Sequence, residues 1–146
     1  AAQTQLDAKA PLASPTFTGT PAAPTASVGT SSTQLATTAF VQGEKASPLN
    51  DQSGTTYTFV ASDAYKTIRS TGSSAASFTV GANVHSAGQS FIVSQTGSGQ
   101  VTLVAGSGMT LNKAAATLKT RAQHSRIAVC FNSATDATVV GDLAAS

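Results

Sequence analysis

The chain has few charged residues, few aromatic residues and almost no cysteine. Of its 146 residues, 10% are charged and 5% are aromatic, and it contains no tryptophan, one methionine and one cysteine. A single thiol excludes an internal disulfide framework. Because Cys130 lies in the apolar run RIAVCF, we expect it to be a small buried hydrophobic side chain. The formal net charge is +2, and no Lys/Arg cluster is dense enough to contact a phosphate backbone, so nucleic acid is not an expected partner.

Long apolar runs are also missing. The longest, such as Ile127–Phe131, are far shorter than a membrane span, and the segment from Ala1 lacks the basic and apolar regions of a signal peptide. We therefore expect no membrane insertion and no secretion signal. The missing initiator methionine leaves two explanations open: it was removed, or the chain is a segment of a longer protein.

Residue types that carry catalysis are sparse and lie outside recognised motifs. His85 in NVHSAG and His124 in RAQHSR belong to no catalytic motif, and the chain contains no G-x-S-x-G elbow. We expect each to be a surface histidine or a hydrogen-bonded structural one. The two histidines and Cys130 are too widely separated to match zinc-ligand spacing. We therefore predict no catalytic, cofactor-binding or metal-binding residue, no cofactor and no enzymatic activity.

The acidic residues offer no recognisable catalytic pair. Asp51, Asp63 and Asp136 lie beside turn residues, where capping and turn formation explain them. A glycan-degrading site needs two converging carboxylates, and spacing along the sequence does not exclude such convergence. A fragment of a glycan-degrading tailspike therefore stays open as an alternative.

A modest basic cluster occurs late in the chain, at Lys119, Arg121, His124 and Arg126. Lys119 and Arg121 alternate on one face of a predicted strand, and the simplest interpretation is a solvated edge strand whose charges discourage aggregation. The alternative is an anion-facing patch that binds acidic surface glycans.

The most strongly patterned part of the chain is 10–42, APLASPTFTGTPAAPTASVGTSSTQLATTAFVQ. Four prolines recur between residues 11 and 24, so this half cannot be a helix and is a poor central strand. Its apolar side chains are too sparse to form a core. We expect it to be ordered only by packing against copies of itself.

The segment 32–46 predicts a short helix, capped by Ser32 or Thr33 and ended by Gly43. Isolated helices below about 12–15 residues are marginal, and a three-stranded bundle of copies would stabilise this one. The expected trimer contacts are Phe17, Leu35, Ala39, Phe40 and Gln42.

From about residue 49 the sequence predicts a β domain of short strands separated by Gly/Ser turns. The predicted strands are 56–61, 66–70, 77–80, 89–95, 100–104, 109–111, 118–122, 126–132 and 137–141. Regular spacing with turn signals indicates a mainly β fold, with an antiparallel β-sandwich or barrel-like domain. The Gly-Ser-Gly segments at 97–99 and 106–108 are expected to be tight turns in which glycine adopts a positive φ. Neither is followed by the residues of a phosphate-binding loop.

The expected organisation is thus an extended Pro-rich arm over 1–31, a short helix and linker over 32–48, and a β domain over 49–146. The stretch KAPLASPTFTGTPAAPTASVGTSSTQLATTAFVQ, Lys9–Gln42, closely resembles the repeat of tail fibres of tailed bacteriophages, in which P-x-F-T-G-T-P-x-A-P leads into T-T-Q-[IL]-A-[TN]-T-A-F-V. Ser31–Ser32 departs from the more frequent Asn-Thr of that family and is a conservative change for capping.

The β domain also resembles a domain common at the C-termini of such fibres. The similar segments are T-T-Y-T-x-V-x-x-D-A at 55–64, G-Q-V-T-L-V-A-G-S-G-M-T-L-N at 99–112, L-K-T-R-A-Q-H-S at 118–125 and V-V-G-D-L at 139–143. The resemblance implies a homotrimer, with the arm and helix as shaft and the β domain as knob. It carries over no catalytic residue.

Two structural functions follow from this resemblance. The first is a trimeric tail fibre, or its C-terminal segment, that contributes to host-surface attachment through loops such as 72–76 or 84–88. The second is a capsid decoration protein built from the same modules, which the short chain favours. Both predict a location on the virion and, as partners, further copies of the chain, other virion proteins and a host-surface glycan or protein.

Overall fold

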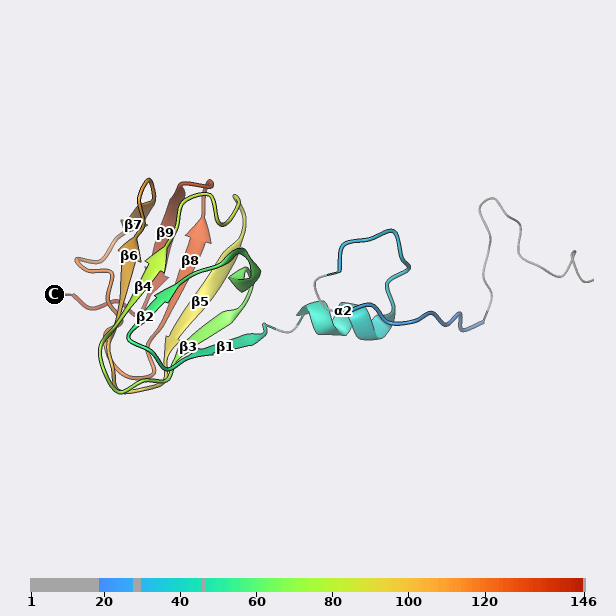
Figure 1. Cartoon of the computed structure of the whole chain (residues 1–146), viewed down its shortest axis with the longest axis horizontal. Coiled ribbons are helices and arrows are strands. Elements are labelled where there is room, and N and C mark those ends of the chain that lie inside the picture. The colour runs from blue at the N-terminus through green and yellow to red at the C-terminus, as the bar shows by residue number, and fades with distance from the viewer. Residues whose placement is uncertain (1–18, 28–29, 46, 146) are drawn as a thin grey trace, which may run out of the picture. The chain divides into compact units, whose positions relative to one another are not determined.

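Figure 1 shows the computed structural model of the chain, which describes residues 19–27, 30–45 and 47–145. The chain divides into two compact units, which we call unit 1 (Ala1–Ala46) and unit 2 (Ser47–Ser146). The predicted arm and helix therefore belong to one unit. The fold is mainly β with one short described helix, as the sequence indicates.

The helix of unit 1 is α2 (Thr38–Lys45). Its N-cap is Thr37, whose Oγ1 accepts a hydrogen bond from the backbone N–H of Phe40 at 3.1 Å. The predicted start at residue 32 is wrong, because the hydroxyl of Ser32 accepts from the nearby Gln34 N–H at 3.4 Å within a bend. The helix is therefore only eight residues long.

The described part of the arm has no regular secondary structure between residues 20 and 27. Pro21 and Pro24 each remove a backbone donor and fix φ, which favours an extended chain here. The Oγ1 atoms of Thr25 and Thr37 lie 2.9 Å apart and join the arm to the start of α2.

Nine strands lie in residues 47–145 of unit 2. They are β1 (Leu49–Gln52), β2 (Thr56–Thr58), β3 (Thr67–Ser70), β4 (Ala76–Val80), β5 (Ser90–Gln95), β6 (Val101–Ala105), β7 (Thr110–Lys113), β8 (Arg126–Phe131) and β9 (Asp136–Gly141). A 3-10 turn, η1 (Ala61–Asp63), follows β2. Strand β1 was not among the predicted strands, because its residues LNDQ show no strand pattern.

The first six strands stack as three coils of a solenoid. Strands β1, β3 and β5 pair in parallel in one sheet, which we call sheet A, and β2, β4 and β6 pair in parallel in a second, sheet B. Each coil contributes one strand to each sheet (Figure 1). The expectation of an antiparallel sandwich is therefore wrong for this half, because successive strands alternate between the two sheets and do not form hairpins.

The C-terminal part of unit 2 extends both sheets. In sheet A, β8 pairs antiparallel with β5, β9 antiparallel with β8, and β7 parallel with β9. In sheet B, single antiparallel bridges join Thr102 to Lys119 and Thr120 to Leu143. The strand predicted at 118–122 is thus present only as these bridges.

The core lies between the two sheets. Alternate residues of each strand point inward, as in Phe91 and Val93 of β5 and Phe78 and Val80 of β4, all at most 1% exposed. Phe59 stacks on Phe91 with ring centroids 4.2 Å apart, and this contact joins the loop after β2 to sheet A. Burial of these phenylalanine side chains stabilises a small domain that has few charged groups.

Candidate interaction surfaces

The described part of unit 1 leaves its apolar side chains exposed. Leu35 is 71% exposed and Val41 43%. A groove of about 650 Å³ runs between the arm and the start of the helix. It is lined by Thr20, Pro21, Ala22, Ala23, Thr25, Leu35, Ala36, Thr37, Thr38 and Ala39. The groove and its rim offer an apolar surface that a single copy does not cover.

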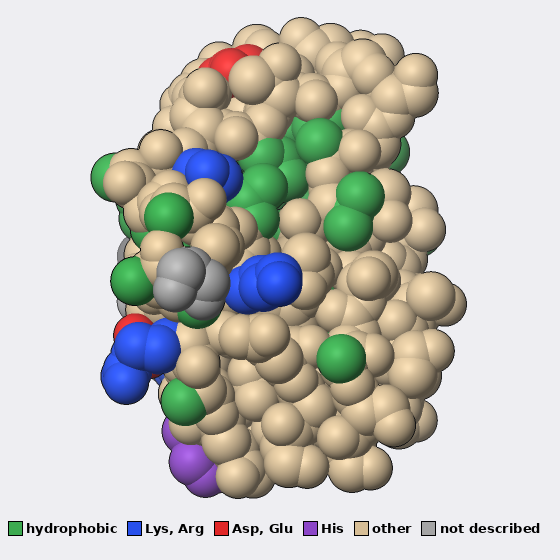
Figure 2. All heavy atoms as spheres, turned by 90° about the vertical axis from the view of Figure 1, so that its left-hand side faces the viewer, with side chains coloured by type: hydrophobic (Ala, Val, Ile, Leu, Met, Phe, Trp, Pro, Cys, Tyr) green, Lys and Arg blue, Asp and Glu red, His purple; other side chains and the backbone are tan. Residues whose placement is uncertain are grey.

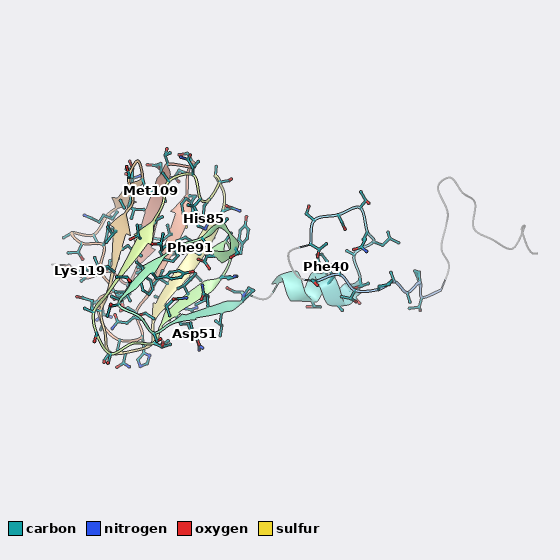
Figure 3. All side chains as sticks on the ribbon, in the orientation of Figure 1. Phe40, Asp51, His85, Phe91, Met109 and Lys119 are labelled. Carbon is teal, nitrogen blue, oxygen red and sulfur yellow. The ribbon has the colours of Figure 1, made fainter. Side chains whose placement is uncertain are left out.

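The structure brings together two of the predicted trimer contacts, since Leu35 and Ala39 line the same groove. Phe40, labelled in Figure 3, lines a neighbouring hollow of about 140 Å³. Leu35 lines this hollow as well. Gln42 is exposed and lines neither hollow. Phe17 lies outside the described residues.

The four predicted basic residues do not share one face. Lys119 and Arg121 flank the inward-facing, buried Thr120, so both point outward from sheet B. Arg126 precedes the buried Ile127 on β8 and points outward from sheet A, where its Nη2 lies 3.4 Å from Thr67 Oγ1. The single anion-facing patch predicted from these residues is therefore not assembled in one copy.

Two of these four basic residues have further contacts or surroundings of note: Arg121 is ion-paired, and His124 lies in an exposed turn. Arg121 Nε and Nη2 donate to the two carboxylate oxygens of Asp142 at 2.6 and 3.0 Å, and these bonds with Ser125 Oγ–H lower the pKa of Asp142 below 3.8. His124 is exposed in a turn with φ 69°, as expected for a surface histidine. Figure 2 shows the Lys and Arg side chains of one side of the molecule as separate groups, one of which lies beside an acidic side chain.

A buried polar cluster joins β1, β2 and η1. The Asp63 carboxyl is fully buried and accepts hydrogen bonds from Tyr57 Oη–H at 2.6 Å, Asn50 Nδ2–H at 2.9 Å and the Val60 N–H at 3.0 Å. Burial and the bond to Asp63 raise the pKa of Tyr57 to about 12. The cluster holds the first coil against the loop that follows it, which agrees with the predicted turn role of Asp63.

Asp51 and Cys130 do not fulfil their sequence predictions. Asp51 lies within β1 and pairs with Arg69 on β3, so it is no turn cap, and Arg69 lowers the pKa of the Asp51 carboxyl. Cys130 is half-buried on the outer face of sheet A, because its neighbours Val129 and Phe131 take the inward positions. The apolar run around Cys130 indicated that this residue is buried, but it did not indicate on which face of the sheet the side chain lies.

His85 also departs from its sequence prediction. Its side chain is 3% exposed, stacks on Phe131 at 4.6 Å and lies 5.3 Å from Phe91 (Figure 3), and neither ring nitrogen has a hydrogen-bond partner among the described residues. Burial lowers its pKa below 6.5, opposed by the nearby Asp63 carboxyl and the Val60 backbone. The loop at 84–88 is therefore partly an internal element, anchored by this ring.

The described residues contain no group of three His, Cys, Asp or Glu side chains arranged to hold a metal ion. None of the helices in this part of the chain has the length and apolar content to cross a bilayer. No known family model matches the chain, and no solved structure matches it either.

Proposed function

We propose that this chain is a structural protein of a bacteriophage virion, namely a trimeric tail fibre or part of one, which contributes to host-surface attachment. The observation that carries the proposal is the exposed apolar surface of unit 1. Leu35 is 71% exposed beside the groove that it lines. Such a surface is the expected face of a self-associating element.

The length of α2 supports the same proposal. Eight residues are fewer than the roughly 12–15 that an isolated helix needs in water, so contacts from outside the helix must stabilise it. Further copies of unit 1, packed around a threefold axis, would supply these contacts. The resemblance of Lys9–Gln42 to the fibre repeat favours three copies.

Unit 2 then serves as the knob of the fibre. A trimer presents each surface loop three times, and multiple attachment multiplies weak contacts with a host glycan or protein. The side chains of sheet B that face outward, such as Thr58, Thr79 and Thr102, are short and neutral. Adhesion therefore rests on the number of contacts and needs no chemical step.

The first test is the mass of the full chain in solution, measured by light scattering. One copy has a mass of 14.5 kDa, and we expect three times that value over a wide range of concentrations. A stable monomer would contradict the proposal, because the exposed groove of unit 1 would then have no occupant.

A capsid decoration protein is the second candidate. The arm at 20–27 has no regular secondary structure and is mostly exposed, as a segment that clamps neighbouring capsid subunits would be. Antibody labelling of virions in the electron microscope separates the two functions. Label confined to the tail supports the fibre, whereas label over the whole capsid supports decoration.

A further inference from the structure

One loop of unit 2 is attached to the core by a single buried side chain. The segment 81–89 connects β4 to β5, and we call its middle part, residues 82–88, the His85 loop. Of the residues from 81 to 90, all of which the structure describes, His85 alone is buried, at 3% exposed. The position of the loop on the domain therefore depends on where this one ring lies.

The backbone of the His85 loop is bonded to other described segments at its two ends. The Asn83 N–H donates to Ala134 O at 2.7 Å, and the Gly88 N–H donates to Phe131 O at 2.9 Å. Both donor residues have a positive φ, 62° for Asn83 and 84° for Gly88, so the chain turns sharply at each end. Opening the loop breaks these bonds and the contacts of the ring, and requires no strand ladder to break.

The ring of His85 lies against aromatic side chains. It stacks on Phe131 of β8 with ring centroids 4.6 Å apart, and lies 5.3 Å from Phe91 of β5 (Figure 3). Neither ring nitrogen has a hydrogen-bond partner among the described residues. An uncharged ring can stay in this environment, whereas a protonated ring brings in a charge and a second N–H donor, which is far more costly to bury.

The nearest acidic group does not compensate for that charge. The Asp63 carboxyl, on η1, favours protonation of the ring, but burial opposes it more strongly and holds the pKa of His85 below 6.5. Asp63 already accepts hydrogen bonds from Tyr57 and Asn50. The backbone of Val60 is occupied as well, since its N–H donates to the Asp63 carboxyl and its oxygen accepts from the Asp63 N–H at 2.9 Å.

The other elements that contact the loop present apolar or occupied side chains. Strands β5 and β8 present Phe91 and Phe131 to the ring. The turn after β8 is followed by Asp136, whose carboxyl accepts from Asn112 Nδ2 at 2.7 Å and from Asn132 Nδ2 at 2.6 Å. Among the described residues, a second ring proton therefore has no acceptor in place while the loop is closed.

We infer that the His85 loop is a pH-dependent element of the fold. In neutral solution the uncharged ring holds the loop against Phe131. In weakly acidic solution the ring binds a proton, leaves the aromatic side chains for water, and the loop opens while both sheets stay folded. Opening is less costly than global unfolding, because the loop contributes one buried side chain and the core of unit 2 keeps all of its own.

Opening changes the surface that unit 2 presents. Phe131 and Phe91, which are 3% and 1% exposed, each lose the cover of the His85 ring. The acidic form therefore exposes an apolar patch beside a released loop. This change needs no second copy of the chain, so it goes beyond the proposed function and holds equally for a fibre and a decoration protein.

Amide hydrogen exchange of the full chain tests the inference. The N–H groups of Asn83 and Gly88 report on the loop, and those of Val93 and Val129, on the paired strands β5 and β8, report on the sheets. Each rate is divided into the rate of an unfolded chain at the same pH, which gives a protection factor. Between pH 7.5 and pH 5 we expect the loop protection to fall about five- to thirtyfold, the upper value being that of a group with an unfolded pKa of about 6.5 that is protonated only when the loop is open.

The sheet amides separate local opening from global unfolding. At both pH values the loop amides should be at least about a hundredfold less protected than Val93 and Val129. Equal protection of loop and sheet amides would mean that the loop opens only when unit 2 unfolds, and overturns the inference. A loop protection that does not change with pH overturns it as well.

Two variants assign the effect to one histidine. His85→Phe keeps an aromatic ring on Phe131 and cannot be protonated, so its loop protection should not change between pH 7.5 and pH 5. The matched control is His124→Asn, which removes the other histidine of the chain from an exposed turn with φ 69°, an angle that asparagine tolerates. This control should keep the full decrease. A decrease that survives in His85→Phe, or is lost in His124→Asn, overturns the inference.

A second measurement leaves His85 in place. In the His124→Asn variant His85 is the one remaining histidine, so its ring protons are identified directly by NMR. Nuclear Overhauser contacts between the rings of His85 and Phe131, whose centroids lie 4.6 Å apart, are expected at pH 7.5. They should disappear as the ring is protonated. Contacts that persist in the protonated protein would show that the loop stays closed, and would overturn the inference.

Discussion

Gly97 lies so close to Gly72 in the preceding coil that a Cβ atom at residue 97 would stand 2.1 Å from the Gly72 carbonyl oxygen. The two turns are also joined by hydrogen bonds, since the N–H groups of Thr96 and Gly97 both donate to Ser70 O. This close approach stacks the second and third coils. Glycine is required at residue 97 by contact and not by its backbone angles.

We therefore expect Gly97→Ala to destabilise unit 2 by about 2–3 kcal/mol, because the backbone of the neighbouring turn must move. The matched control is Gly54→Ala in the first turn of the stack, where the nearest atom, Thr56 O, would be 3.7 Å away. That variant should stay within about 0.5 kcal/mol of the original protein. Urea unfolding followed by circular dichroism measures both, and equal losses would contradict the stacking account.

The sequence predicted that these Gly-Ser-Gly segments are turns but gave the wrong reason for most of their glycines. Positive φ occurs at Gly108, with φ 74°, whereas Gly97 and Gly99 are needed because the turn at 72–74 lies against them. That requirement comes from a segment more than twenty residues away. No local pattern in a single sequence contains it.

Most of the strands could be predicted, because alternation of apolar residues is a local property, but β1 could not, since its residues LNDQ show no such alternation. The pairing of the strands could not be predicted, since the same alternation of apolar residues suits parallel and antiparallel neighbours. The basic residues illustrate the limit for the candidate surfaces. Lys119, Arg121 and Arg126 are close together in the sequence, but Lys119 and Arg121 point outward from sheet B and Arg126 points outward from sheet A.

The hydroxyl of Tyr57 is expected to contribute to stability through the buried Asp63 carboxyl. Tyr57→Phe removes the 2.6 Å bond to Asp63 and the 2.9 Å bond from Asn50, and should cost about 1–3 kcal/mol. Tyr65→Phe is the control, because Tyr65 is 61% exposed. It should change the free energy of unfolding by less than about 0.5 kcal/mol.

The same tyrosine predicts a loss of stability in alkaline solution. The pKa of Tyr57 is raised from 10 to about 12 in the folded protein, so its contribution is complete below pH 10 and falls as the pH rises towards 12. In the Tyr65→Phe variant the phenolate absorbance should therefore rise only near pH 12 or on unfolding. A rise near pH 10 in the folded protein would contradict the buried hydrogen bond.

His85 predicts a pH dependence in weakly acidic solution. Its pKa is lowered by burial, so below about pH 6.5 the unfolded chain binds a proton that the folded protein does not. The free energy of unfolding should fall as the pH decreases from about 6.5, by at most about 1.4 kcal/mol per pH unit, until the folded pKa is reached. The lowered pKa values of Asp51 and Asp142 act below about pH 3.8, outside this range.

His85→Phe keeps the aromatic stack on Phe131 and removes both unpartnered nitrogens. At pH 7 this variant should be as stable as the original protein or more so, because the two buried ring nitrogens without a partner are removed. Between pH 5 and about 6.5 its stability should be flatter than that of the original protein. Urea unfolding over this range gives both values, and an unchanged slope would assign the pH dependence to another group.

The groove of unit 1 predicts which of its residues hold the copies together. Leu35→Lys places a charge on the side chain that is most exposed beside the groove, and each of three copies loses the burial of one leucine, worth about 1.5–3 kcal/mol. The variant should lose the trimeric mass at concentrations where the original protein keeps it. Gln42→Lys introduces the same charge on an exposed helical residue that lines neither hollow, and should keep the trimeric mass. If Gln42→Lys dissociates the protein as readily as Leu35→Lys, the copies meet along the helix and not at the groove.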